Sequence, residues 1–579
     1  IAPENDDSKH ISIICSACQQ TMYPHHLLYH KKTHKALTLL GFDSLQTKTD
    51  NKTLLAQRQK LITKLTKIPK YSEAHRQKVD YSFEFLMDNN APTRYCDFAD
   101  INNPSTFLRV NNSLIKALSV CQDKNSMWQA DMEDRFIVLD NYGNRSDTCF
   151  LGLFDGSHGA TAAGTVAAEL PLLFLDQLAQ TDSSYKKSKD EQQVLDSFAT
   201  VIRADYREKE QLFSDKAGND KTDKTNTYEW IHKAYAKSFW RMDRLLRLGR
   251  NEVSKVRWSG CSAVTCLVES IPRETNGTEE EGKNHSEAAT HSPLTSRARG
   301  AAGLLHIANV GNAHAVLCKN GKSHCLSKEH STSNASERKR ILQNGGNIST
   351  NQPDGLVEGY LRTTRGLGHH GDPVLKRSVL PVPHTISIPI DDTCQFLILA
   401  SNGLWEVLDY NEVLALTLKT FTHYLKRYEC VQQNGTPPCK CQHLMALTED
   451  NLNDSKAIKD LQDATELVYS NKQPKLSRRN HLQKKMDSEI FHDQLASYAG
   501  QEPLRTVSPL GSKPPSQVEE DTKTYSSSCK PQSAGTGRAA SETLYDKAAS
   551  YISEQLVKTA LAAGSRDNIT IMIVLLNGC

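Results

Sequence analysis

Four short segments of this 579-residue sequence each place an acid or an amide where a predicted strand begins or ends, and this pattern constrains the fold most. They are "WQADMED" (128–134), "LFDGSHG" (153–159), "LASNGLWE" (399–406) and "GSRDNIT" (564–570). Each alone has an ordinary explanation, since Asp-Gly pairs form turns and Glu-Asp pairs are commonly solvated. If the fold brings them together, the carboxylates must hold cations to offset their repulsion. The series therefore predicts one cation site assembled from distant parts of the chain.

From about residue 115 onward, predicted strands and helices follow one another. Helices are predicted over "ATAAGTVAAEL" (160–170) and around 541–562, where Gly564 ends the second. Asn320-Gly321 is a strong hairpin signal, and another turn falls at Gly311-Asn312. Consecutive strands joined by such turns favour largely antiparallel sheets. The predicted strands are "CFLGLFDG" (149–156) running into an Asp-Gly turn, three strands within 303–326, "TISIPI" (385–390), "FLILAS" (396–401) and "NITIMIVLL" (568–576).

Two polar stretches, at about 273–300 and 430–540, interrupt this pattern and are predicted to be loops or disordered insertions. A hydrophobic content of only 38% agrees with such insertions. A Cys/His group opens the second stretch, but its spacing matches no usual zinc-binding pattern. It consists of Cys430, Cys439, Cys441 and His443.

Charge and cysteine usage limit the functions that the chain can have. With 70 basic and 67 acidic residues, the formal net charge of +3 gives no support to a polyanion-binding protein. No run of 18 apolar residues predicts a membrane span, and the polar start "IAPENDDSKH" is unlike a signal peptide. The 15 cysteines lack regular spacing, which suits a reducing compartment. We therefore expect an intracellular protein, cytoplasmic or nuclear.

Residues 11–38, here called the Cys/His unit, carry the spacing Cys15-x2-Cys18-x11-His30-x3-His34. This is one residue shorter in the middle than the usual C2H2 zinc finger, so we predict a zinc site at these four residues, against the alternative of an unstructured tail. A single finger is a poor reader of DNA, and a protein contact is at least as good an explanation. Residues 39–114 are predicted to be a helical linker region, with an apolar stripe over 53–68. That stripe fits a helix packed on a neighbour, or a membrane-surface or calmodulin-type helix.

Further segments extend the opening series: "WSGCSAV" (258–264), "ANVGNAHAVL" (308–317), "EHSTSNASERKRI" (329–341) and "GYLRTTRGLG" (359–368). In this order the segments resemble the signatures of the metal-dependent protein phosphatase 2C family. The resemblance implies an α+β fold for residues 115–575, in which two antiparallel β-sheets form a sandwich flanked by α-helices, with the polar insertions extending from it. It also implies two Mn²⁺ or Mg²⁺ ions whose bridging water attacks phosphoserine or phosphothreonine.

The resemblance assigns metal-binding roles to five residues. Asp155 matches the carboxylate that bridges both metals, and Gly156 matches a backbone carbonyl ligand. Glu133 and Asp134 match the acidic pair that serves the second metal and its waters, and Asp567 matches a late ligand of the first metal. All five are present in this sequence.

Other positions depart from the family pattern. Gln129 stands where the family has a phosphate-clamping Arg, and a neutral amide cannot offer the charged, two-pronged donor that suits phosphate. Asn402 replaces a metal-binding Asp, and hard divalent cations prefer charged oxygen. Ser157 replaces a His assigned as general acid, and His158, one position later on a tight turn, is not expected to rescue it. Two further departures are Asn312, which replaces an Asp associated with a third metal, and His369, which replaces the Asp that follows R-A-L-G.

Substitution of several family residues around one centre predicts that the fold is kept while the catalytic activity is lost. We therefore expect a pseudophosphatase that binds a partner or phosphoprotein, with one Mg²⁺ or Mn²⁺ ion at most, near Glu133 and Asp155. The alternative is a weak Mn- or Mg-dependent protein serine/threonine phosphatase. A nucleic-acid-associated protein led by the Cys/His unit is a third interpretation, which the balanced charge disfavours.

Overall fold

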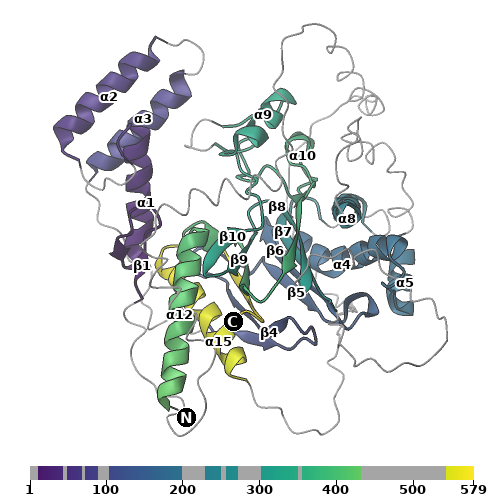
Figure 1. Ribbon diagram of the computed structural model, residues 1–579. Coiled ribbons are helices and arrows are strands. Elements are labelled where there is room, and N and C mark those ends of the chain that lie inside the picture. The colour runs from purple at the N-terminus through teal and green to yellow at the C-terminus, as the bar shows by residue number, and fades with distance from the viewer. Residues whose placement is uncertain are drawn as a thin grey trace, which may run out of the picture. The chain divides into compact units, whose positions relative to one another are not determined.

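The computed structural model describes residues 11–43, 49–67, 72–88, 103–198, 228–249, 256–271, 302–349, 355–431 and 543–579 (Figure 1). The predicted insertion at 273–300, and residues 432–540 of the second, lie outside the described residues. So does most of the Cys/His group at 430–443.

Two antiparallel β-sheets form the centre of the protein, as predicted. The first has the strand order β10-β9-β13-β14-β4-β3 and the second the order β12-β8-β7-β6-β5, with β11 paired to β7. The strands of the first sheet are β3 (Thr106–Leu108), β4 (Ile115–Asp123), β9 (His314–Lys319), β10 (Lys322–Cys325), β13 (Cys394–Ala400) and β14 (Ile569–Leu576). Those of the second are β5 (Arg135–Leu139), β6 (Thr148–Ser157), β7 (Gly260–Ser270), β8 (Gly303–Val310), β11 (Leu367–Gly368) and β12 (His384–Ile390).

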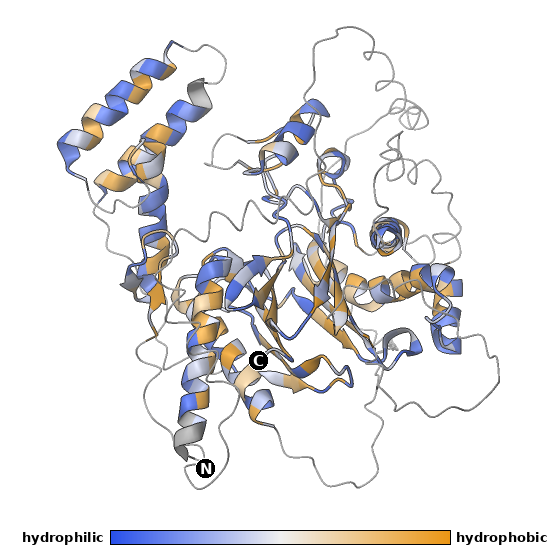
Figure 2. Cartoon of the chain, viewed as in Figure 1, coloured by the Kyte–Doolittle hydropathy of each residue, from blue (hydrophilic) through white to orange (hydrophobic). Residues whose placement is uncertain are grey.

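Apolar residues on both faces of the strands explain why the sheets are covered on both sides. In β13, Leu397 and Leu399 belong to the buried cluster between the two sheets, whereas Phe396 and Ile398 belong to a second cluster beneath helices. Successive side chains of a strand point to opposite faces, so a continuous apolar run requires a layer on each side. Figure 2 shows these strands and α4 (Thr161–Thr181) as the most continuous apolar segments.

Helices complete the layers on the outer faces of the sheets (Figure 1). α4 and α8 (Glu229–Leu248) share a buried cluster with β6 and β7, and α12 (Tyr410–Val431) and α15 (Leu544–Ala562) share one with β13 and β14. α4 is long and apolar enough to cross a membrane by length and composition, but 67% of the window that meets this test is buried in the protein. The predicted α+β sandwich is therefore confirmed. The shorter helices are η3 (Tyr142–Asn144), α5 (Lys189–Asp196), α9 (Ala335–Gln343), α10 (Pro373–Ser378) and α11 (Asn402–Trp405).

The Cys/His unit folds as a small ββα arrangement that runs into further helices. Strands β1 (Ile13–Ile14) and β2 (Thr21–Met22) pair antiparallel, and α1 (Pro24–Leu39) follows. The predicted helix at 53–68 is observed as α2 (Asn51–Leu65), and it packs with α3 (Ser72–Met87) and the end of α1 in a separate apolar cluster.

One predicted turn differs from the structure. Asp155 and Gly156 lie inside β6, paired with β7, and the left-handed turn comes later, at His158 and Gly159. The predicted turn at Gly311-Asn312 is observed, and it carries the chain from β8 in one sheet to β9 in the other. The Asn320-Gly321 hairpin is confirmed, since β9 and β10 pair directly and both turn residues have positive φ.

Candidate functional site

Antiparallel pairing brings the four opening segments to one edge of the sandwich. Arg135 at the start of β5 is paired with Phe154 of β6, so Asp134 lies beside Asp155. In the other sheet, Ala400 at the end of β13 is paired with Ile571 of β14, which brings the residues after β13 close to those before β14. The sheets then meet at this edge, where the backbone N–H of Asn402 donates to Asp155 Oδ2 at 2.6 Å.

Glu133 and Gly156 are in close contact at this edge. A Cβ atom added to Gly156 would lie 2.5 Å from the backbone oxygen of Glu133, so no larger residue fits there without a shift of the backbone. The Glu133 carboxylate accepts the backbone N–H of Gly159 at 2.8 Å, across the turn after β6. The glycine is thus required by the close approach of β6 to the segment that precedes β5, independently of any metal.

Asp134 and Asp155 are both buried, with exposed fractions of 2% and 6%. Burial raises the pKa of Asp134 to about 7, against hydrogen bonds from Ser401 and Thr570 that favour the charged form. Burial, with the negative charges of Asp134 and Asp567, raises the pKa of Asp155 as well. Carboxylate oxygens are the ligands that hard divalent cations such as Mg²⁺ and Mn²⁺ prefer, so metal binding by these acids stays a prediction.

Asn402 lies between the acids and donates to two of them. Its side-chain Nδ2 donates to Asp567 Oδ2 at 2.9 Å, while its backbone N–H donates to Asp155. The amide group therefore presents a donor to Asp567, where a carboxylate would present a second negative oxygen.

Asn568, to which sequence reasoning gave no role, ties the segment between β4 and β5 to the loop before β14. Its Oδ1 accepts the backbone N–H of Glu133 at 2.8 Å, and its Nδ2 donates to the carbonyl oxygens of Lys124 and Asp131. It is 3% exposed. The segment "GSRDN" could have indicated this role, because an Asn beside a predicted ligand at the start of a strand is well placed to bridge backbone groups.

Ser157 and His369, which the sequence presents as separate departures, contact each other. Ser157 Oγ lies 3.2 Å from His369 Nε2, although the two residues are 212 positions apart in the chain. His369 is buried, and this burial lowers its pKa to about 4. His158 lies edge-on to His369, with ring centroids 5.8 Å apart. The two departures therefore form one hydrogen-bonded pair.

The positions of Gln129 and Asn312 are also determined by hydrogen bonds. Gln129 Nε2 donates to the backbone oxygen of Arg566 at 2.8 Å, and the Arg566 guanidinium lies over the ring of Trp128 at 4.6 Å. Asn312 Oδ1 accepts from Ser262 Oγ at 2.6 Å. At both positions the amide is engaged with this chain's own groups.

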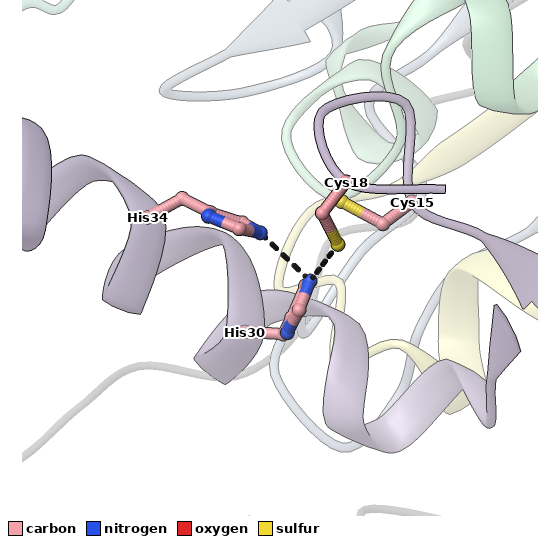
Figure 3. Close-up of side chains that lie close together, drawn as sticks. All are labelled: Cys15, Cys18, His30 and His34. Atoms are coloured by element: carbon pink, nitrogen blue, oxygen red, sulfur yellow. Dashed lines mark hydrogen bonds between the residues drawn. The ribbon is translucent and has the colours of Figure 1, made fainter. Parts of the chain in front are cut away.

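Cys15, Cys18, His30 and His34 gather as the spacing predicted (Figure 3). Their ligand atoms all lie within 4.8 Å of one another, and in the described part of the chain this is the only group of three or more His, Cys, Asp or Glu residues with that property. Cys18 Sγ lies 3.1 Å from His30 Nε2, which in turn lies 2.9 Å from His34 Nε2. Ligand atoms around a tetrahedral zinc ion lie about 3.3–3.8 Å apart, so this donor set fits Zn²⁺ with small adjustments.

A sandwich of two antiparallel sheets that gathers acids at one edge is the arrangement of the metal-dependent phosphatases of the 2C type. The chain belongs to the protein phosphatase 2C family. The family model for protein phosphatase 2C matches residues 273–433.

The similarity to curated relatives extends over nearly the whole chain. The chain is 43% identical to protein phosphatase 2C-like domain-containing protein 1 of Homo sapiens, over 97% of this chain and 89% of the relative. It is 37% identical to the Mus musculus protein of the same name, over 98% and 88%. Among solved structures, a phosphatase from a pathogenic strain of Toxoplasma gondii matches with a TM-score of 0.38 and 12% identity, covering 83% of this chain and 96% of that one.

Proposed function

We propose that this chain is a pseudophosphatase, a phosphatase 2C-like domain that binds a partner or phosphoprotein and does not usefully catalyse the hydrolysis of phosphate esters. The contact of Asn402 with Asp567 carries the proposal. A residue that donates to the neighbouring acid does not offer that acid's metal another anionic oxygen.

Because Asn402 supplies no anionic oxygen, we propose that the site holds one divalent ion at most, near Glu133 and Asp155. When bound, Mg²⁺ or Mn²⁺ in such a site polarises a phosphoryl oxygen and makes hydroxide available near neutral pH. Asp155 and Asp134 remain as acceptors for it. Asn402 holds Asp567 through a hydrogen bond and so competes with a metal for that carboxylate.

The phosphate position supports binding in preference to catalysis. Gln129 cannot supply a charged donor, and its amide is engaged with the Arg566 backbone. Losing one charged donor to a developing transition state costs on the order of 3 kcal/mol, or about a hundredfold in rate. The Arg566 side chain, exposed and placed over Trp128, still offers a guanidinium to a phosphate group.

Exposed aromatic residues beside the site support a protein partner. Trp128 is 42% exposed and precedes Gln129. Trp258 is 62% exposed. It precedes Ser259, whose backbone oxygen accepts the backbone N–H of His369. Tryptophan is rare on surfaces and enriched at the energetic centres of interfaces.

Phosphate release from phosphoserine and phosphothreonine peptides in millimolar Mn²⁺ tests this proposal. The natural chain is compared with a variant that carries Gln129→Arg, Asn402→Asp, Ser157→His and His369→Asp. The last two changes are made together because the two side chains contact each other. Activity in the natural chain equal to that of competent family members would overturn the proposal, and activity confined to the variant would support it.

A weak Mn- or Mg-dependent serine/threonine phosphatase is the second candidate. The retained acids Glu133, Asp134, Asp155 and Asp567 favour it, because a high Mn²⁺ concentration could compensate for one neutral ligand. In the same assay, slow Mn²⁺-dependent release that Asp155→Asn abolishes would select this candidate.

The Cys/His unit is proposed to bind one structural Zn²⁺ ion through Cys15, Cys18, His30 and His34. The convergence of the four ligand atoms carries this proposal. Burial lowers the pKa of His30, which favours the neutral imidazole that metals bind. Zinc content of the purified full chain after dialysis tests it: one zinc per chain, lost in Cys18→Ser, is expected, and no retained zinc would reject the site.

A further inference from the structure

We propose that the Cys/His unit is an internal clamp: its zinc site holds it against residues 407–412, the segment that follows Asn402, and so stabilises one wall of the phosphatase-like site. The inference rests on the zinc site proposed above. It assigns the unit a contact within its own chain in place of a nucleic-acid ligand.

The apolar core of the Cys/His unit is continuous with that of the sandwich. Ile13 is 2% exposed and Leu27 is fully buried, and both belong to the cluster that also contains Val407, Leu414 and Phe421. The unit is too small to bury these side chains in a core of its own. It therefore completes its core on the outer face of the first sheet's helical layer.

A partly buried ion pair fixes the position of α1 on this surface. Lys31 Nζ forms an ion pair with Glu412, whose side chain is fully buried, and donates to the backbone oxygen of Val407 at 3.2 Å. Asp409 lies 3.7 Å from the same ammonium group. Removing one partner of a buried pair leaves an uncompensated charge, so this contact is specific.

The loop that carries the two cysteines makes the second polar contact. Ser16 Oγ donates to Asp409 Oδ2 at 2.5 Å, and the Ser16 backbone N–H donates to Glu412 Oε1 at 3.4 Å. At the edge of the unit, Lys419 Nζ donates to Ser12 Oγ at 2.9 Å. Asp409 and Glu412 thus bind the loop and the helix of the unit together.

Each half of the zinc site places one of these contact residues. Ser16 directly follows the ligand Cys15, and Lys31 directly follows the ligand His30. Zinc joins the loop to the helix, so it fixes the spacing between Ser16 and Lys31 that Asp409 and Glu412 require. Strands β1 and β2 pair with each other on either side of the cysteine loop, so their pairing closes the loop but does not join it to α1.

The clamped segment leads directly into the site. Glu406 donates its backbone N–H to the oxygen of Asn402 at 2.8 Å, and its carboxylate accepts the backbone N–H of Arg566. Residues 402–406 therefore contact the loop that carries Asp567, and residues 407–412 contact the Cys/His unit. Holding the second stretch restrains the first, because they are consecutive in the chain.

α1 contacts this chain's own residues on more than one side. Leu27 is buried in the core that the unit shares with α12. Further along α1, the ring of Tyr29 lies 5.2 Å from that of Phe85 in α3. Two sides of α1 are therefore covered by this chain's own residues.

Hydrogen exchange of the full chain tests the clamp, with zinc content measured on the same samples. The variant Lys31→Met should keep one zinc per chain but raise the exchange rate of backbone amides in residues 402–421 by about tenfold or more. Lys32→Met is the matched control, because Lys32 is exposed on the same helix, and it should leave exchange unchanged. Ser16→Ala, a milder change that removes one hydrogen bond, should raise the same rates by a smaller factor of about three to ten.

Zinc removal from the natural chain gives a second measurement that needs no variant. A zinc-selective chelator should accelerate exchange in residues 402–421, and zinc added back should reverse this. The clamp is wrong, while the zinc site stands, if adding and removing zinc leaves the exchange rates of residues 402–421 unchanged. It is also wrong if Lys31→Met exchanges at the same rates as Lys32→Met. If the natural chain binds no zinc, the zinc site itself is wrong and the clamp falls with it.

Discussion

Replacing Asn402 by Asp restores the residue type of the competent family members and tests how the site stabilises its acids. The change removes the hydrogen bond from Nδ2 to Asp567 and places a second negative charge about 3 Å away. A hydrogen bond to a charged group contributes about 1.5–3 kcal/mol, and the repulsion adds to this loss. We expect Asn402→Asp to lower stability without divalent ions by about 2–4 kcal/mol, or roughly 3–6 °C in Tm for a folded unit of this size.

Divalent ions should reverse this loss, because the new carboxylate completes an anionic ligand set. At a metal concentration about 100-fold above Kd, binding to the folded state alone contributes about 2.7 kcal/mol. The assay is thermal unfolding of zinc-loaded protein, with and without Mn²⁺. Asn402→Ala is the control: it loses the hydrogen bond without adding charge, so its Tm should fall less and should gain less from Mn²⁺ than that of Asn402→Asp.

Two outcomes would refute this reasoning. If Asn402→Asp unfolds at the same temperature as the natural chain without Mn²⁺, the amide does not neutralise Asp567. If Asn402→Ala gains as much from Mn²⁺ as Asn402→Asp does, the metal response does not depend on the carboxylate.

The remaining predictions concern the framework of the site. Gly156→Ala should cost about 1–3 kcal/mol in chemical denaturation, because its Cβ would meet the Glu133 backbone at 2.5 Å, whereas Gly164→Ala, in an open position of α4, should stabilise by up to about 1 kcal/mol. Asn568→Ala should cost about 2–4 kcal/mol, because it leaves three backbone groups without their partner. Burial opposes the charge of Glu337, but hydrogen bonds and charge from arginines outweigh it and lower its pKa to about 2. Its contribution is therefore complete above about pH 4.3 and lost as pH falls toward 2, and Glu337→Gln should flatten the pH dependence of Tm in that window.

The sequence predicted the layers of this fold because apolar periodicity reports burial directly. The runs at 396–401 and 568–576 became β13 and β14, buried on both faces, and the helix after residue 160 became α4. Turn chemistry predicted less. The residue pair Asp155-Gly156 resembles a turn, but its glycine allows β6 to approach the backbone of Glu133 before β5, which only the three-dimensional arrangement reveals.

The candidate site was predictable as a set of residues but not as a set of contacts. The ligands of the Cys/His unit lie within 20 residues of one another, and their spacing alone brings them together. Ser157 and His369 are 212 positions apart, so the sequence around one residue does not predict its contact with the other. The sequence likewise did not predict the contacts of Ser16 with Asp409 and of Lys31 with Glu412. They depend on where two segments that are far apart in the chain meet in the fold.

The contacts of Asn402 explain how the site can keep buried acids while one family carboxylate is absent. Two buried carboxyl groups beside a third acid repel one another, and burial already raises the pKa of Asp134 and Asp155. Bound cations would offset this repulsion. Here one residue supplies a backbone donor to Asp155 and a side-chain donor to Asp567. Substitution to an amide thus removes a negative charge and adds a donor at the same point, so the acids become less dependent on metal for stability. Selection for a stable partner-binding scaffold would retain such a change, whereas selection for rapid hydrolysis would remove it.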